Sequence, residues 1–188
     1  SSAIGDYISY THEGVRILFS VTGETTNMQK YPGTVSVGKS TGSSYTVSIP
    51  KETTGIVKIP SQIVYMNNKY NVTGISNYAF KDCESVEQLE IPKSVTTIGK
   101  GAFNNCSSLT SVEIPESVTD IGEAAFSGCS SLVSVGLPKS VYNLRTQMFS
   151  DCVNLKKVDM ASISSVGEGA FYNCEGLEVI TLNAKLIY

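Results

Sequence analysis

Residues 109–132 read LTSVEIPESVTDIGEAAFSGCSSL and residues 89–109 read LEIPKSVTTIGKGAFNNCSSL, so the same residue types recur on the same frame. Phenylalanines mark this frame at intervals of 23, 23, 23 and 22 residues, and a cysteine follows each after three residues. The pairs are Phe80 and Cys83, Phe103 and Cys106, Phe126 and Cys129, Phe149 and Cys152, and Phe171 and Cys174. A fixed period of this length predicts a solenoid, because one unit alone cannot bury its apolar face and stacked coils share a core.

A single unit predicts the path of one coil. Val112 and Ile114 alternate with polar residues, so we expect both to point inward from a strand, and Pro115 ends that strand because it lacks an N–H group. Gly122 permits a tight bend, and residues 123–126 have the helix propensity for one or two turns. The pattern predicts an α/β, β-rich fold with stacked parallel strands and short helical turns on the other side.

The first part of the chain departs from this frame. Residues 1–55 are rich in Tyr, Thr, Ser and Gly, and they contain apolar runs that predict antiparallel strands at 7–10, 15–21, 34–37 and 45–49. We interpret residues 1–55 as an N-terminal capping segment and residues 56–188 as a solenoid of about five units of 22 or 23 residues. The first unit has an insertion at 61–72, which we expect to form a hairpin that projects from the solenoid.

Composition excludes several classes of function. The chain has 188 residues, 41% of them apolar, and a net charge of −3. Its lysines are scattered and it has only Arg16 and Arg145 as arginines, so it lacks the basic stripe that nucleic acids require. No apolar run approaches the ~20 residues of a membrane span. The sequence opens without an initiator Met or an apolar leader, so we expect that any signal segment is absent from this chain.

Residues that could carry out catalysis or bind metals are sparse. His12 is the only histidine, and the five cysteines occur once per repeat rather than with zinc-ligand spacing, so we expect no enzyme, metal or cofactor. Glu90, Glu113 and Asp159 occupy equivalent strand positions, which raises hydrolysis or weak calcium binding as alternatives, but an open sheet offers no pocket. Equivalent cysteine side chains on stacked coils point in parallel, so we expect five free thiols.

The unit I-P-x-S-V-T-x-I-G-x-x-A-F-x-x-C-x-x-L resembles the BspA-like leucine-rich repeat of bacterial surface and secreted proteins, over roughly residues 55–182. Ser94, Ser117 and Ser140 stand where the commonest leucine-rich repeats have Asn. The resemblance implies a right-handed solenoid with a parallel sheet on its concave face, located at the cell surface or outside a bacterial cell. Members of this family are known or suspected adhesins.

These observations favour a non-catalytic binding module for host or bacterial proteins or glycans. We expect the chain to be a monomer. The alternative is a structural spacer, or a fragment of a larger surface protein, without a ligand of its own. The outward positions of the expected concave face are Glu87, Gln88, Glu90, Ser111, Glu113, Ser134, Lys156, Lys157, Asp159, Val179 and Thr181. A second candidate site is the insertion, with Tyr65, Asn67, Asn68 and Tyr70, unless its tyrosines merely cover the joint between cap and first repeat.

Overall fold

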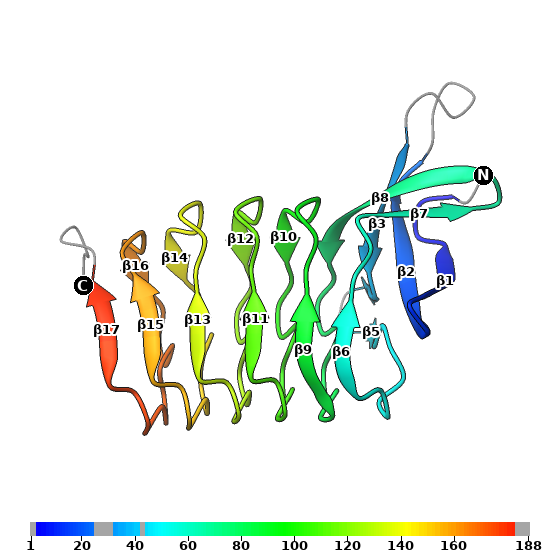
Figure 1. Ribbon diagram of the computed structural model, residues 1–188. Coiled ribbons are helices and arrows are strands. Elements are labelled where there is room, and N and C mark those ends of the chain that lie inside the picture. Colours follow the sequence, from blue (N-terminus) through cyan, green and yellow to red (C-terminus); the bar gives the residue numbers. More distant parts are fainter. Residues whose placement is uncertain (1–2, 25–31, 42–43, 183–188) are drawn as a thin grey trace.

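The computed structural model describes residues 3–24, 32–41 and 44–182, and within them the chain forms a row of stacked coils (Figure 1). The expected hairpin and the other two strands of the N-terminal segment lie at one end of this row. From its apolar residues we expect the C-terminal end, residues 181–188, to fold back over the last coil, but residues 183–188 lie outside the described residues.

One sheet contains a single strand from every coil. Its strands are β6 (Gly55–Lys58), β9 (Val86–Glu90), β11 (Ser111–Glu113), β13 (Ser134–Gly136), β15 (Lys157–Met160) and β17 (Val179–Leu182). They lie side by side in this order and every pair is parallel. Leu89 pairs with Val112, and Val135 pairs with Val158, so the apolar strand positions form one buried column. The expected parallel sheet is confirmed.

A second sheet, which the sequence did not predict, runs along the back of the coils. It begins with β1 (Tyr7–His12), β2 (Val15–Gly23) and β3 (Gly33–Val37), and continues through β8 (Asn68–Ile75), β10 (Thr97–Ile98) and β12 (Asp120–Ile121). Two further coils contribute a separate parallel pair, β14 (Asn143–Leu144) and β16 (Ser165–Val166). β1, β2 and β3 are antiparallel, whereas β3, β8, β10 and β12 are parallel. The back sheet therefore runs without a break across the sequence boundary at residue 55.

The insertion forms the expected hairpin, and its second strand also takes part in the back sheet. β7 (Gln62–Tyr65) pairs antiparallel with β8 around a turn in which Met66 and Asn67 have positive φ. β8 then pairs with β3 on one side and with β10 on the other. The insertion is thus the strand that joins the N-terminal segment to the repeats, because its backbone continues the back sheet.

Two other local expectations need correction. The strand expected at 45–49 is only β5 (Ser44–Thr46), which pairs with β4 (Lys39–Thr41). The helical turns expected at 123–126 do not form: none of the described residues is helical, and Ala124 has φ 52°. Within the described ranges there is consequently no helix that could cross a membrane.

A ribbon of β-turns replaces the helical turns. In the second coil the N–H groups of Gly101, Phe103 and Asn105 donate to carbonyls of the next coil, each at 2.8 Å. The intervening N–H group of Asn104 donates instead to the carbonyl of Gly101, three residues earlier in its own coil. Alternate N–H groups therefore tie neighbouring coils together, and this pattern is incompatible with the i to i−4 bonding of an α-helix.

The core follows the frame of the repeat. Phe80, Phe103, Phe126 and Phe149 are completely buried, and successive rings along the row, including the partly buried Phe171, stack with centroids 5.1–5.8 Å apart. Phe126 lies in the middle of this row, with a stacked ring on each side. Stacked coils therefore share one continuous apolar interior, as expected for a repeat protein.

Candidate functional site

We call the outward side of the six-stranded sheet the strand face. Its register aligns two columns of side chains across the coils. The first column is Ile56, Gln88, Ser111, Ser134, Lys157 and Val179, and the second is Lys58, Glu90, Glu113, Gly136, Asp159 and Thr181. Glu87 and Lys156 flank the first column, and every residue proposed from the sequence for this face is exposed. The structure therefore brings the predicted positions together on one surface.

The strand face is acidic on one half and balanced in charge on the other. Glu87, Glu90 and Glu113 outnumber Lys58 on its N-terminal half, whereas Lys156 and Lys157 are balanced by Asp159 and Glu178 on its C-terminal half. Gly136 separates Glu113 from Asp159 in the second column, so the carboxylates do not form a continuous row. Across the described ranges, no group of three or more His, Cys, Asp or Glu side chains is placed to hold a metal ion.

The strand face is hollowed at β9 and β11. A depression of about 290 Å³ lies over these strands, and a second of about 570 Å³ lies beside the turns that follow them. Ile91 and Glu113 line both, so the two depressions adjoin. The second one has an apolar lining from Ile114 and Pro115 with charged side chains around it. The sequence predicted the exposed residues here but not the hollow, because its depth depends on how adjacent coils stack.

The insertion hairpin offers less surface than expected. Tyr70 is completely buried and Asn68 is 9% exposed, so neither is available to a partner without movement of the hairpin. Tyr65 is partly buried against the core, and the exposed residues of the two strands and their turn are Gln62, Val64, Met66, Asn67 and Lys69. A Cβ atom added at Gly33 would lie 2.8 Å from the Tyr70 ring, so this ring is packed against the N-terminal segment. Tyr70 therefore belongs to the joint between that segment and the repeats.

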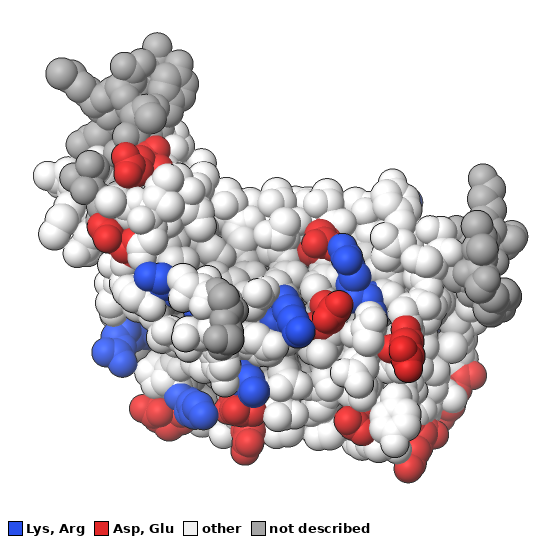
Figure 2. All heavy atoms as spheres, turned by 180° about the vertical axis from the view of Figure 1, so that it is seen from behind, with Lys and Arg blue, Asp and Glu red and all other residues white. Residues whose placement is uncertain are grey.

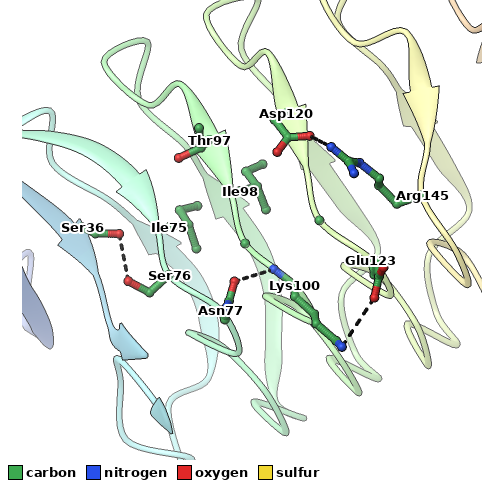
Figure 3. Close-up of a pocket in the computed structure, with 12 residues that line it drawn as sticks. Ser36, Ile75, Ser76, Asn77, Thr97, Ile98, Lys100, Asp120, Glu123 and Arg145 are labelled. Carbon is green, nitrogen blue, oxygen red and sulfur yellow. Dashed lines mark hydrogen bonds and ion pairs between the residues drawn. The ribbon is translucent and has the colours of Figure 1, made fainter. Parts of the chain in front are cut away.

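The back sheet carries a polar groove of about 550 Å³ that the sequence did not predict (Figure 3). Its rim holds two ion pairs between coils: Lys100 Nζ lies 3.4 Å from Glu123 Oε2, and Arg145 donates a 2.9 Å hydrogen bond to Asp120. Figure 2 shows basic and acidic side chains intermixed over this side of the molecule. Each cation near the groove thus has an acidic neighbour, which leaves little net charge to attract a charged ligand.

A recurring glycine lines this groove. Gly99 and Gly122 occupy one frame position, and a Cβ atom at Gly122 would lie 2.4 Å from the Lys100 backbone nitrogen. Arg145 stands at the same position one coil further on, and a second depression of about 320 Å³ continues beyond it to Gly167. The glycine frame and its replacement by Arg145 were the sequence signals that could have revealed the groove.

The cysteines are structural. All five are free, and the four in the later coils donate from Sγ to the phenylalanine carbonyl of the preceding coil at 3.0–3.2 Å. Burial raises the pKa of the Cys83 and Cys152 thiols to about 12 and that of the other three above its ordinary value. A protonated, buried thiol is a poor nucleophile, so these side chains are not suited to covalent catalysis.

Residues 73–188 match the model of the BspA type leucine rich repeat region, in six copies. The chain belongs to this family. The match covers more than half of the 188 residues, and the sixth copy extends the five units counted from the Phe-x-x-Cys frame. No curated protein sequence matches the chain.

Solved structures agree with the BspA-type assignment. A leucine rich repeat protein of T. pallidum is 27% identical with a TM-score of 0.67, over 85% of this chain and 67% of that protein. A leucine rich cell surface protein of Faecalibacterium prausnitzii is 23% identical with a TM-score of 0.53, over 92% of this chain and 54% of the other. The pneumococcal vaccine antigen PcpA shares 17% identity and a TM-score of 0.64, over 98% and 51% respectively. The likeness to the F. prausnitzii protein and to PcpA shows the fold alone, and this chain spans about half of the length of each of them.

Proposed function

We propose that this chain is a non-catalytic binding module of a bacterial surface protein, and that it recognises a protein partner through the strand face. The observation that carries the proposal is the hollow over β9 and β11, which joins an apolar lining at Ile91 and Ile114 to the exposed carboxylates of Glu90 and Glu113. Apolar contact at the centre with charged groups around it is the usual composition of a protein-binding surface.

A protein fits this face better than a glycan. Within the described strand face no aromatic side chain occupies either outward column, and aromatic rings are the side chains that supply large flat apolar area at low entropic cost. The acidic N-terminal half, with Glu87, Glu90 and Glu113, instead favours a partner with basic groups at complementary positions, which would fix the orientation of the complex.

Location and domain roles form part of this proposal. Display at the cell surface is supported by the BspA-type family and by the description of one structural relative as a cell surface protein. We assign residues 1–55 to a cap and residues 56–188 to the solenoid. Support for the cap comes from the pairing of β3 with β8, which covers the edge that the first coil would otherwise expose in the back sheet.

The test begins with capture of the purified chain on an array of matrix proteins and glycans. Binding of the captured partner is then measured for the double variant Glu90→Lys, Glu113→Lys and for a matched control, Glu168→Lys, Glu175→Lys. Both variants change net charge equally, and all four side chains are exposed. We expect the first to lose about tenfold or more in affinity and the control to bind like the unmodified chain. Equal losses, or capture by glycans only, would refute the proposal.

A further inference from the structure

The hydrogen bonding of the back sheet is interrupted at one junction between coils. In the coil of β12, the N–H group of Thr119 donates to the Thr96 carbonyl of the preceding coil at 2.9 Å. Further along the same coil, the N–H group of Gly122 donates to the Ile98 carbonyl at 2.8 Å. Equivalent pairs of bonds tie the coil of β10 to that of β8 and the coil of β16 to that of β14, at 2.7–2.9 Å. Between the coils of β12 and β14, whose residues are all described, neither bond forms and the strands do not pair.

Arg145 accounts for this interruption. Wherever the second bond forms, its donor is a glycine, at Gly99, Gly122 and Gly167. A Cβ atom at any of these three positions would lie 2.4–2.5 Å from a backbone nitrogen of the preceding coil, so only glycine permits the close approach. Arg145 stands at this position in the coil of β14, and its Cβ atom keeps that coil too far from β12 for the bonds to form.

The missing bonds leave donors and acceptors at the junction without their usual partners. By analogy with the bonded coils, the Thr119 carbonyl lacks the N–H group of Tyr142, and the Ile121 carbonyl lacks the N–H group of Arg145. Thr119, Tyr142 and Arg145 are exposed residues, so a ligand in solution has access to this junction. A ligand that satisfies both kinds of group must donate hydrogen bonds as well as accept them, and a hydroxyl group does both.

The back groove passes over this junction. Asp120 and Gly122 line its larger part of about 550 Å³, Leu144 lines the depression of about 320 Å³ beyond it, and Glu123 and Arg145 line both. The two hollows therefore adjoin and together extend from β8 to β16. Strands of adjacent coils repeat at about 4.8 Å, so a linear ligand with regularly spaced polar groups can repeat its contacts from coil to coil.

The charges along the groove are paired between coils. Lys100 Nζ lies 3.4 Å from Glu123 Oε2, and the Arg145 guanidinium lies 2.9 Å from Asp120 Oδ1 (Figure 3). All four side chains are exposed. A charged ligand would have to displace one partner of a pair, whereas the hydroxyl groups of a neutral ligand can donate to the carboxylates and accept from the cations while both pairs remain.

We propose that the back groove binds a neutral linear oligosaccharide that lies across the junction of β12 and β14. Its hydroxyl groups donate to the carboxylates of Asp120 and Glu123, and they accept from the guanidinium group of Arg145 and from the N–H groups that the interruption leaves free. No aromatic ring is among the described residues that line the two hollows, so hydrogen bonds rather than ring stacking supply the affinity. This site is separate from the strand face, so either assignment can fail without the other.

NMR titration of the isotopically labelled 188-residue chain tests the proposal. The probes are the linear pentasaccharides cellopentaose, maltopentaose, xylopentaose and chitopentaose. We expect at least one of them to shift the backbone amide signals of Tyr142 and Arg145, because its hydroxyl groups contact these N–H groups. The amide signals of Gln88 and Ser111 on the strand face should stay unchanged.

Arg145→Gly tests the role of the interruption. This variant removes the guanidinium group and restores the glycine of the frame, so the missing backbone bonds form and hydrogen exchange of the residue 145 amide slows towards that of Gly122. We expect its affinity for the bound pentasaccharide to fall at least about tenfold. The matched control Arg16→Gly removes the same charge from β2, outside the groove, and should bind like the unmodified chain.

Three results would overturn the proposal. The first is that no pentasaccharide shifts the Tyr142 or Arg145 amide at millimolar concentration, or that the shifted amides lie on the strand face. The second is that Arg145→Gly binds as tightly as the unmodified chain. The third is that the residue 145 amide of this variant exchanges no more slowly, which would contradict the explanation of the interruption. None of these results bears on capture of a protein by the strand face.

Discussion

Replacing Phe126 by Ala tests whether stability is shared between stacked coils. The Phe126 ring is completely buried, with Phe103 at 5.1 Å on one side and Phe149 at 5.5 Å on the other. Removal of a fully buried Phe side chain costs about 3–5 kcal/mol in unfolding free energy, because apolar contacts are lost and a cavity remains. The position in the middle of the row places the Phe126→Ala variant at the upper end of that range.

Phe171 is the matched control. Its ring is only partly buried and stacks on a single described neighbour, Phe149, at 5.8 Å. One missing aromatic pair accounts for about 0.5–1.5 kcal/mol, and incomplete burial lowers the transfer contribution further. We therefore expect Phe171→Ala to cost about 1–3 kcal/mol, and Phe103→Ala, which again has two stacked neighbours, to match Phe126→Ala.

Urea denaturation followed by circular dichroism measures these costs. The midpoint and the slope must be fitted together, since a repeat protein can lose its end coil before the rest unfolds. Equal costs at Phe126 and Phe171, or a smaller cost at Phe126, would contradict the reasoning that coils are stabilised by neighbours on both sides.

Two further stability predictions rest on single positions. Gly122→Ala should cost about 1–3 kcal/mol in unfolding free energy, because its Cβ would lie 2.4 Å from a backbone nitrogen of the preceding coil. The control is Gly136→Ala, whose Cβ would have no atom within 4 Å and which should change the unfolding free energy by less than about 1 kcal/mol in the same urea melts. The raised thiol pKa values mean that the folded chain retains protons that the unfolded chain releases above about pH 9, so stability should decline from pH 9 towards pH 12. Cys152→Ser, which removes one titrating group, should make that decline shallower in denaturant titrations, and an unchanged slope would contradict burial of this thiol.

Sequence reasoning succeeded at frame positions whose side chains have the same surroundings in every coil. The Phe-x-x-Cys frame places the same ring and the same thiol in equivalent surroundings, so periodicity alone was enough to predict the shared core and the strand register. It failed at Ala124, because helix propensity is a local property and the turn ribbon is decided by hydrogen bonds to the next coil. It also failed for β8, whose position depends on pairing with β3, more than 30 residues away in sequence.

For the candidate site, too, the sequence predicted some features and not others. Alternation along each strand predicted that Glu90 and Glu113 would be exposed. The burial of Tyr70 against Gly33 agrees with the alternative that the insertion covers the joint, although the sequence could not choose between this and an exposed site, because the contact joins segments that are distant in sequence. The hollow beside Ile91 was missed because it depends on how adjacent coils stack, and the back groove was missed because Gly122 was interpreted only as a bend.

Site-specific photo-crosslinking tests most directly whether recognition uses the strand face. A photoreactive residue is placed at Ser111, which is exposed at the middle of that face, or at Thr119, which is exposed beside the back sheet of the same coil. The account predicts a covalent adduct with the captured partner from position 111 and none from position 119. An adduct from position 119 alone would contradict it.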